Sequence, residues 1–288
     1  MVNKNIKDFQ EKIWDFYKLN KRDFPWRQTS DPYKIFISEV MLQQTQATRV
    51  VPKYLLLLKE FPTFESLAAS TNEDVLRLWS GLGYNRRALY LKRAAEIIIH
   101  KNSISTGLKP FHFGSRIESK HWEKTIWLRP EFLQTLPGIG PNTAGSIYVF
   151  SYNLPHVFIE TNIRRVFIHE FFADREDITD KEILKLVKDS LDQKNPRNWY
   201  YALMDYGAFL GKLPTNPNLK SKHYTKQSKF EGSLRQTRGK ILKILLHEKN
   251  ITKEILENKV NSIHLEKALS QLEKEKFISN KNSIIKLV

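Results

Sequence analysis

The stretch that decides the fold is residues 131–166, EFLQTLPGIGPNTAGSIYVFSYNLPHVFIETNIRRV. Its first half predicts a short helix that ends before Pro137, followed by a tight turn and a second helix. Gly138 and Gly140 suit a turn that needs positive φ or a close approach of the backbone. A glycine turn that leads into a helix N-terminus presents free N–H groups, which suit a phosphate oxygen. On geometry alone, an ordinary pair of packed helices fits the pattern equally well.

The residues after the turn continue the helix and then carry a second motif. Asn142 or Thr143 is expected to cap the second helix. LPGIG at 136–140, TAG at 143–145 and ETNIRRV at 160–166 follow one another in this order. This order and spacing resemble the helix-hairpin-helix DNA glycosylase superfamily. The resemblance implies an all-α, two-lobed fold that binds DNA between its lobes.

The composition favours a polyanionic partner. The 288 residues include 47 Lys and Arg against 31 Asp and Glu, a net charge of +16 that suits nucleic acid. The plain alternative is a basic protein without such a partner. The chain has no cysteine, so an iron–sulfur cluster is excluded and no cofactor is expected. It also shows no signal-peptide core or membrane-length apolar run, so we expect a cytoplasmic, nucleoid-associated protein without membrane contact.

A glutamate on an apolar helix face is the first candidate catalytic group. Asp31 and Pro32 form a typical helix start. Within this helix, Glu39 follows Ile35 by four residues and precedes Leu42 by three, which places its carboxylate on the apolar stripe. Burial there requires a raised pKa or a partner, and a raised pKa suits a general acid. The alternative is a boundary glutamate paired with an arginine.

A polar run directly after this helix extends the resemblance. SEVMLQQTQ at 38–46 is similar to the signature of MutY-type adenine DNA glycosylases, which remove adenine opposite guanine or oxidised guanine. By itself, such a run is usually a polar helix end. The resemblance implies that Glu39 protonates the adenine ring, and that Gln43, Gln44 and Thr45 contact the DNA bases.

The segment GLGYNRR at 81–87 predicts a second hairpin that enters a helix. Tyr84 is either a packing aromatic or, by resemblance, a wedge beside the lesion, with Leu82 and Gln44 acting on the opposite base. Arg86 and Arg87 would then contact phosphates. The resemblance implies further DNA contacts in and after the first hairpin, at Leu136, Gly138, Ile139, Gly140 and Thr143. Most relatives also present an iron–sulfur loop to phosphate, and in this cysteine-free chain Lys220 and Lys222 stand in the segment that replaces that loop. For Lys220 and Lys222, a solvated linker is the equal alternative.

Three residues beyond the first hairpin complete the candidate site by resemblance. Glu160 stands where the superfamily nearly always has aspartate, and its extra methylene adds about 1.5 Å of reach. Either the backbone adjusts, or the enzyme works differently or slowly. Asn162 matches an asparagine that helps to hold the attacking water. Asn142 replaces the Schiff-base lysine of endonuclease III-type relatives, so no strand-nicking lyase is expected. No metal site is expected beyond a monovalent cation at the backbone carbonyls of residues 136–141.

The predicted organisation is a glycosylase domain at 1–228 and a winged-helix-like α+β domain at 229–288. Residues 28–135 are expected to form a six-helix lobe, and the N-terminal helix joins 136–228 in the second lobe. The C-terminal domain shows three helices and a two-stranded hairpin, and it either binds DNA or docks on the catalytic part. Residues 101–130 are longer than the connection that the family usually has at this place. They are either a surface insertion with added DNA contacts or a simple loop.

The leading hypothesis is a monomeric, monofunctional adenine DNA glycosylase that acts on adenine opposite G or 8-oxoguanine in double-stranded DNA. Two alternatives stay open. One is a thymine or uracil mismatch glycosylase of the same fold, for which Asn142 and Glu160 leave room. The other is a lesion-DNA binder in which Glu160 marks decayed catalysis.

Overall fold

The structure is a computed structural model that describes residues 5–106, 129–226, 228–281 and 283–288. The predicted insertion at 101–130 therefore lies mostly outside the described residues. The chain divides into two compact units. The first comprises Met1–Glu39, Ile117–Thr135 and Ile139–Lys226, and the second comprises Val40–Arg116, Leu136–Gly138 and Gln227–Val288. The chain crosses into the second unit after Lys226, and the domain boundary at 228 stays a prediction.

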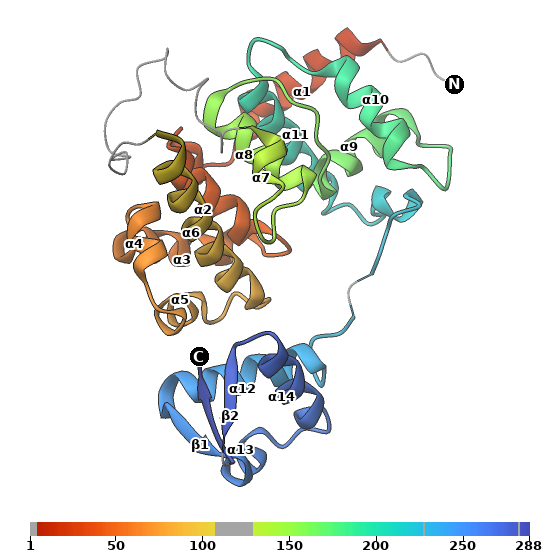
Figure 1. The fold of residues 1–288 in the computed structure, drawn as a ribbon. Coiled ribbons are helices and arrows are strands. Elements are labelled where there is room, and N and C mark those ends of the chain that lie inside the picture. Colours follow the sequence, from red (N-terminus) through yellow and green to blue (C-terminus); the bar gives the residue numbers. More distant parts are fainter. Residues whose placement is uncertain (1–4, 107–128, 227, 282) are drawn as a thin grey trace. The chain divides into compact units, whose positions relative to one another are not determined.

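The first unit is helical where the structure describes it (Figure 1). It contains α1 (Ile6–Asn20), the 3-10 turn η1 (Pro25–Arg27), most of α2 (Pro32–Leu42), α7 (Pro130–Leu133), α8 (Pro141–Tyr152), α9 (Thr161–Phe171), α10 (Asp180–Ser190), α11 (Pro196–Leu210) and the 3-10 turn η4 (Pro217–Lys220).

An aromatic core fixes the helices of the first unit. The apolar face of α1 buries Phe9, whose ring centroid lies 5.3 Å from that of Phe167 and 6.0 Å from that of Trp199. Each of these residues is fully buried, and burial of one such side chain contributes about 1.5–3 kcal/mol. Because Phe167 and Trp199 lie on α9 and α11, this core holds the helix whose N-terminus carries Glu160.

The second unit combines a helical lobe with the C-terminal domain. It contains α3 (Ala47–Glu60), α4 (Phe64–Ala69), α5 (Asn72–Trp79), α6 (Arg86–Thr106), α12 (Leu234–Glu248), β1 (Asn250–Thr252), α13 (Lys253–Val260), α14 (Leu265–Lys274), β2 (Ile278–Lys281) and β3 (Ile284–Leu287). Trp79 is fully buried at the end of α5, and its indole N–H donates to the Gly83 carbonyl at 3.0 Å. The core of the lobe thereby anchors the 81–84 turn. No helix among the described residues is both long and apolar enough to cross a bilayer.

The C-terminal domain confirms the winged-helix prediction and adds a strand. The three helices and the β2–β3 hairpin appear as expected (Figure 1). The short strand β1 pairs with β3, with Ile251 opposite Ile285, and the antiparallel order is β1-β3-β2. Three residues are too few to show an alternating pattern, so the sequence does not reveal β1.

The first hairpin agrees with the prediction at one glycine and differs at the other. Gly138 has φ +78°, and a Cβ there would lie 2.7 Å from Tyr90 Cδ2, so both conformation and space require glycine. Gly140 has φ −88° and is itself the N-cap of α8. The expected cap at Asn142 or Thr143 is wrong because Pro141, suited to the first helical position, starts the helix earlier.

Candidate active site

Glu39 lies near the end of α2, the helix whose first turn is capped by Asp31 as predicted. Asp31 Oδ1 accepts from the Tyr33 N–H at 2.9 Å. Further along this helix, Glu39 Oε2 lies 2.6 Å from Ser146 Oγ on α8. Burial raises the pKa of Glu39 to about 7, with the hydrogen bond from Ser146 opposing the shift and the charge of Glu160 adding to it. The position of Glu39 predicts a raised pKa or a partner, and the structure gives it both.

Ser146 can serve both protonation states of Glu39. Its Oγ also lies 3.0 Å from the carbonyl oxygen of Thr143, and a hydroxyl has only one proton to donate. When Glu39 is ionised, Ser146 donates to the carboxylate. When Glu39 is protonated, the acid donates to Oγ and the hydroxyl proton turns to the Thr143 carbonyl. The carboxyl group is thus held in place while it gains or loses its proton.

Glu160 caps the N-terminus of α9. Its Oε1 accepts from the N–H groups of Asn162 at 2.9 Å and Ile163 at 3.1 Å. Burial raises the pKa of Glu160, and these backbone bonds, the Asn162 side chain and the charge of Arg165 oppose the rise. The donors and the positive end of the helix dipole favour the carboxylate form. The two glutamates therefore differ: among the described residues, Ser146 donates to Glu39, whereas Glu160 accepts from several donors.

Asn162 is oriented by a neighbouring arginine that the motif contains. Its Nδ2 lies 3.3 Å from Glu160 Oε2, and its Oδ1 accepts from Arg165 Nη1 at 2.8 Å. Arg165 Nη1 also donates to the carbonyl of Gly207 on α11 at 2.7 Å. A Cβ at Gly207 would lie only 2.3 Å from the backbone oxygen of Asn162, so the contact requires glycine.

Asn142 ties the start of α8 to the segment before Glu160. Its Oδ1 accepts from the Ile159 N–H at 3.2 Å. The structure thus brings together all four predicted catalytic residues within the first unit: Glu39, Asn142, Glu160 and Asn162.

Three supporting residues were not singled out from the sequence. Ser146 lies four residues after Asn142 on α8, and Arg165 lies three after Asn162 on α9, so helical spacing was an available signal. Gly207 had no comparable local signal, because its close contact with Asn162 arises between two helices.

The predicted DNA-contacting turns lie in the second unit and show unusual backbone conformations. Gln44 has φ +54° and Tyr84 has φ +47°. Left-handed conformations are uncommon for residues other than glycine, and such strain is concentrated at functional positions. Gln43, also in the first of these turns, donates from Nε2 to the Gly138 carbonyl at 3.0 Å.

Arg87 holds the two turns together. Its guanidinium donates to the carbonyls of Met41 at 2.8 Å and Gly83 at 3.1 Å, and to Thr45 Oγ1 at 2.8 Å. Only 8% of Arg87 is exposed, and burial lowers its pKa to about 10. The expected phosphate contact is therefore replaced by a positioning role, because the side chain is buried against backbone oxygens.

The remaining predicted DNA contacts differ in how accessible they are. Three apolar side chains are buried, so only their backbone is available to a ligand: Leu82, Leu136 and Ile139. Five residues of the predicted DNA-contacting set are exposed: Gln44, Arg86, Gly138, Gly140 and Lys222. Lys220 is held by the carbonyl of Ala173 and lies 3.5 Å from Glu176, whereas Thr143 is partly buried.

Metal binding by side chains has no candidate site among the described residues, where His, Asp and Glu form no cluster of three or more. The carbonyl of Gly138 accepts from Gln43, and that of Gly140 accepts from the Ala144 N–H. A monovalent cation at the 136–141 carbonyls stays a prediction.

Comparisons with known proteins give curated relatives of the chain. An adenine DNA glycosylase of Buchnera aphidicola subsp. Baizongia pistaciae is 34% identical over 214 residues, covering 73% of this chain and 54% of that protein. The Homo sapiens adenine DNA glycosylase is 28% identical over 211 residues, covering 69% of this chain and 35% of that protein. The chain thus spans about half the length, or less, of these curated relatives.

Solved structures share the fold, and a family model matches more than half of the sequence. A thermostable thymine-DNA glycosylase superposes with a TM-score of 0.58 at 23% identity, covering 75% of this chain and 92% of that chain. A trapped endonuclease III–DNA covalent intermediate gives 0.58 at 16% identity, covering 75% and 90%. Residues 37–193 match the model for the HhH-GPD superfamily base excision DNA repair protein. The chain therefore belongs to the HhH-GPD superfamily of base excision DNA repair proteins.

Proposed function

We propose that this protein is a monofunctional adenine DNA glycosylase that hydrolyses the N-glycosidic bond of adenine opposite G or 8-oxoguanine in double-stranded DNA. The observation that carries the proposal is Glu39, an acid with a pKa of about 7 that interacts electrostatically with the carboxylate of Glu160. The curated relatives named adenine DNA glycosylase support adenine as the base.

The two acids divide the reaction between them. Protonated Glu39 gives its proton to a ring nitrogen of adenine, which makes the base a better leaving group. As the N-glycosidic bond breaks, positive charge develops on the sugar, and the capped carboxylate of Glu160 stabilises it. Asn162, held by Arg165 at 2.8 Å, orients the water that adds to the anomeric carbon, and the proton of this water passes to the carboxylate of Glu160. Two acids with different environments are thus assigned to two roles.

Asn142 supports hydrolysis without strand cleavage. An amide nitrogen cannot form an imine with the sugar, so this position supplies no Schiff-base nucleophile. In the structure the Asn142 side chain instead accepts from the backbone at Ile159. We therefore propose that the protein releases the base and leaves an intact abasic strand, acting as a monomer without a resident cofactor.

A base-release assay tests this function. The protein is incubated with labelled duplexes that contain A:G, A:8-oxoguanine, T:G or U:G, and each strand is then analysed with and without alkali. We expect cleavage of the adenine strand only after alkali, and none with Glu39→Gln. Release of thymine or uracil with intact adenine strands would contradict the proposal and favour a mismatch glycosylase. Binding without release from any duplex would favour a decayed lesion binder.

A further inference from the structure

The first helix of the C-terminal domain carries that domain's concentrated positive charge. Helix α12 has four cationic residues and a single acid at its last position: Arg235, Arg238, Lys240, Lys243 and Glu248. Helix α14 occupies the place of the usual recognition helix in a winged-helix fold, yet its charges balance: Glu266, Lys267, Glu273 and Lys274. The electrostatic attraction for phosphate therefore favours α12.

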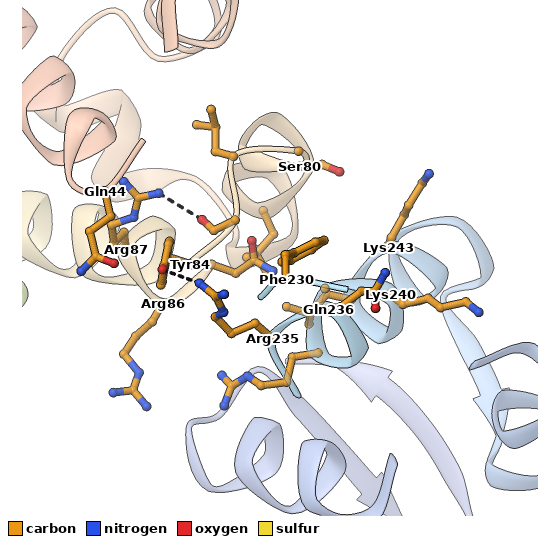
Figure 2. Close-up of a pocket in the computed structure, with 18 of the residues that line it drawn as sticks. Gln44, Ser80, Tyr84, Arg86, Arg87, Phe230, Arg235, Gln236, Lys240 and Lys243 are labelled. Atoms are coloured by element: carbon orange, nitrogen blue, oxygen red, sulfur yellow. Dashed lines mark hydrogen bonds between the residues drawn. The ribbon is translucent and has the colours of Figure 1, made fainter. Parts of the chain in front are cut away.

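Helix α12 forms one side of a groove within the second unit. The groove has a volume of about 1170 Å³, and the predicted DNA-contacting residues Gln44 and Tyr84 line it together with α12 (Figure 2). The described residues that line it include no acid, and, besides the buried Arg87, six of them are cationic: Arg49, Arg86, Arg235, Arg238, Lys240 and Lys243. Because its described lining is cationic and contains no acid, this groove suits an extended polyanion.

Specific contacts fix α12 beside the 81–84 turn. Arg235 Nη1 donates to the Tyr84 hydroxyl at 2.6 Å, and its guanidinium lies 5.5 Å from the centroid of the Tyr84 ring (Figure 2). Glu275 then links Arg238 on α12, at 2.6 Å, with Arg86 on α6. Burial acts to raise the pKa of Glu275, but the two arginines outweigh it and lower that pKa to about 2. The linkage therefore persists at neutral pH.

We propose that α12, not α14, is the DNA-binding helix of the C-terminal domain. Together with the turns at Gln44 and Tyr84, it forms a channel for the phosphate backbone of the strand opposite the everted nucleotide. Lys240 and Lys243 are exposed and line the groove, and they supply the phosphate contacts, for which Lys240 Nζ exchanges its bond to the Val260 carbonyl (3.0 Å) for a phosphate oxygen. Arg235 acts through the Tyr84 hydroxyl and is a positioning residue for the wedge. This inference rests on the proposed function for its partner, duplex DNA.

The salt dependence of DNA binding tests the proposal. In the full chain carrying Glu39→Gln, which prevents base release, the double variant Lys240→Gln, Lys243→Gln is compared with Lys267→Gln, Lys274→Gln on α14. All four lysines are exposed, so the charge change is matched. Affinity for an A:G duplex is measured by fluorescence anisotropy across a salt series. Loss of two phosphate contacts should reduce the slope of log K against log[salt] by about 1.8, whereas the α14 variant keeps the parent slope.

A second arm identifies the strand. Neutral methylphosphonate linkages are placed near the mismatch in one strand at a time. With the neutral linkages in the strand opposite the adenine, the α12 variant and the parent should bind with equal affinity. If the α12 variant and the parent bind with equal affinity only when the neutral linkages lie in the adenine strand, the strand assignment is overturned. A reduced slope for the α14 variant, or no change for the α12 variant, would overturn the assignment of the helix.

The variant Arg235→Ala tests whether α12 contacts the DNA or instead covers the DNA-binding surface of the 81–84 turn. If α12 contacts DNA, this variant should bind the duplex several-fold more weakly with an unchanged thermal unfolding midpoint, and Arg235→Lys should recover part of the loss. Tighter binding would mean that α12 covers the DNA surface, which overturns the proposal. The readout is binding by a protein that releases no base, so it is independent of the proposed activity. If the protein with Glu39 intact releases adenine but the α12 variant keeps the parent salt slope, only the assignment of α12 is rejected. If the α12 variant has a reduced slope but the protein with Glu39 intact releases no adenine, only the proposed activity is rejected.

Discussion

The two units use charged residues in opposite ways. In the first unit, Glu39 and Glu160 are carboxylates whose pKa values are raised by burial, and protein donors hold them in place. In the second unit, Lys240 and Lys243 are exposed on a groove without acidic lining among its described residues. Proton transfer near neutral pH needs a carboxyl group removed from water, whereas phosphate binding needs accessible cations. Each unit is therefore suited to one half of the proposed reaction, proton transfer in the first and phosphate binding in the second.

Backbone strain also differs between the two regions. Glu160 has an extended conformation, with φ −130° and ψ 178°, which is ordinary for an N-cap. Gln44 and Tyr84 have positive φ, and the buried Arg87 bonds to the backbone around both turns. Side-chain hydrogen bonds thus hold Glu160 on backbone of ordinary conformation, whereas Arg87 holds the two predicted DNA-contacting turns on strained backbone.

The largest expected effect is on catalysis, from Glu39→Gln. An amide of the same size cannot protonate adenine, so the single-turnover rate of base release should fall by about 10²–10⁴-fold. DNA affinity should stay within twofold, because the cationic groove is unchanged. The rate is measured with enzyme in excess over an A:G duplex. The matched comparison is Lys240→Gln, Lys243→Gln, which should weaken binding but keep the rate at saturating protein; a reversed pattern would contradict the division of roles.

Much of the acid site could be predicted from sequence because its signals are local. The i, i+3 and i, i+4 spacing places Glu39 on the apolar stripe of its helix, and the structure gives it the expected partner and raised pKa. The glycine requirement at Gly138 follows from the turn, and Asp31 followed by Pro32 marks a helix start. Each of these features depends on a few consecutive residues, which a sequence displays directly.

The features that could not be predicted depend on packing between distant segments. Arg87 has the sequence context of a phosphate-binding arginine, but Trp79 and the carbonyls around it make it a buried support. Gly207 is required because α11 approaches Asn162 closely. Likewise, nothing in the local pattern of α12 shows that Arg235 bonds to Tyr84, 151 positions away in the chain.

Gly207→Ala tests whether the close approach of helices supports the site. The added methyl group would lie 2.3 Å from the backbone oxygen of Asn162, so the free energy of unfolding should fall by about 1–3 kcal/mol and base release should slow. Gly239→Ala on α12 is the control, because a Cβ there meets nothing within 4 Å. It should raise the free energy of unfolding by about 0.5–1 kcal/mol. Urea unfolding measures both, and equal effects would contradict the packing argument.

The pH dependence should follow the protonation of Glu39. Its pKa is about 7 in the folded protein against 4.5 as the ordinary value. The folded state therefore holds the proton more tightly than the unfolded state, and stability falls as pH rises from about 4.5 to 7. The single-turnover rate should decrease about tenfold per pH unit above 7, where the acid is lost.

The control for this pH effect is the stability of Glu39→Gln, which has no proton to lose. Its free energy of unfolding should exceed that of the parent by an amount that grows between pH 4.5 and 7 and is constant above. Urea unfolding at several pH values measures the difference. A difference independent of pH would show that Glu39 titrates normally, and the acid role would then need another explanation.

The smallest expected effect comes from Ser146→Ala. The Ser146 hydroxyl stabilises the ionised form of Glu39, because its donated bond lowers the pKa that burial raises. Removal of this donor should move the alkaline limb of the rate profile to higher pH, with only a few-fold change in the maximum rate. Ser151→Ala removes another buried serine hydroxyl from the same helix and should leave the limb in place. Because a purely structural role of Ser146 would lower the rate equally at every pH, the movement of the limb is the decisive measurement.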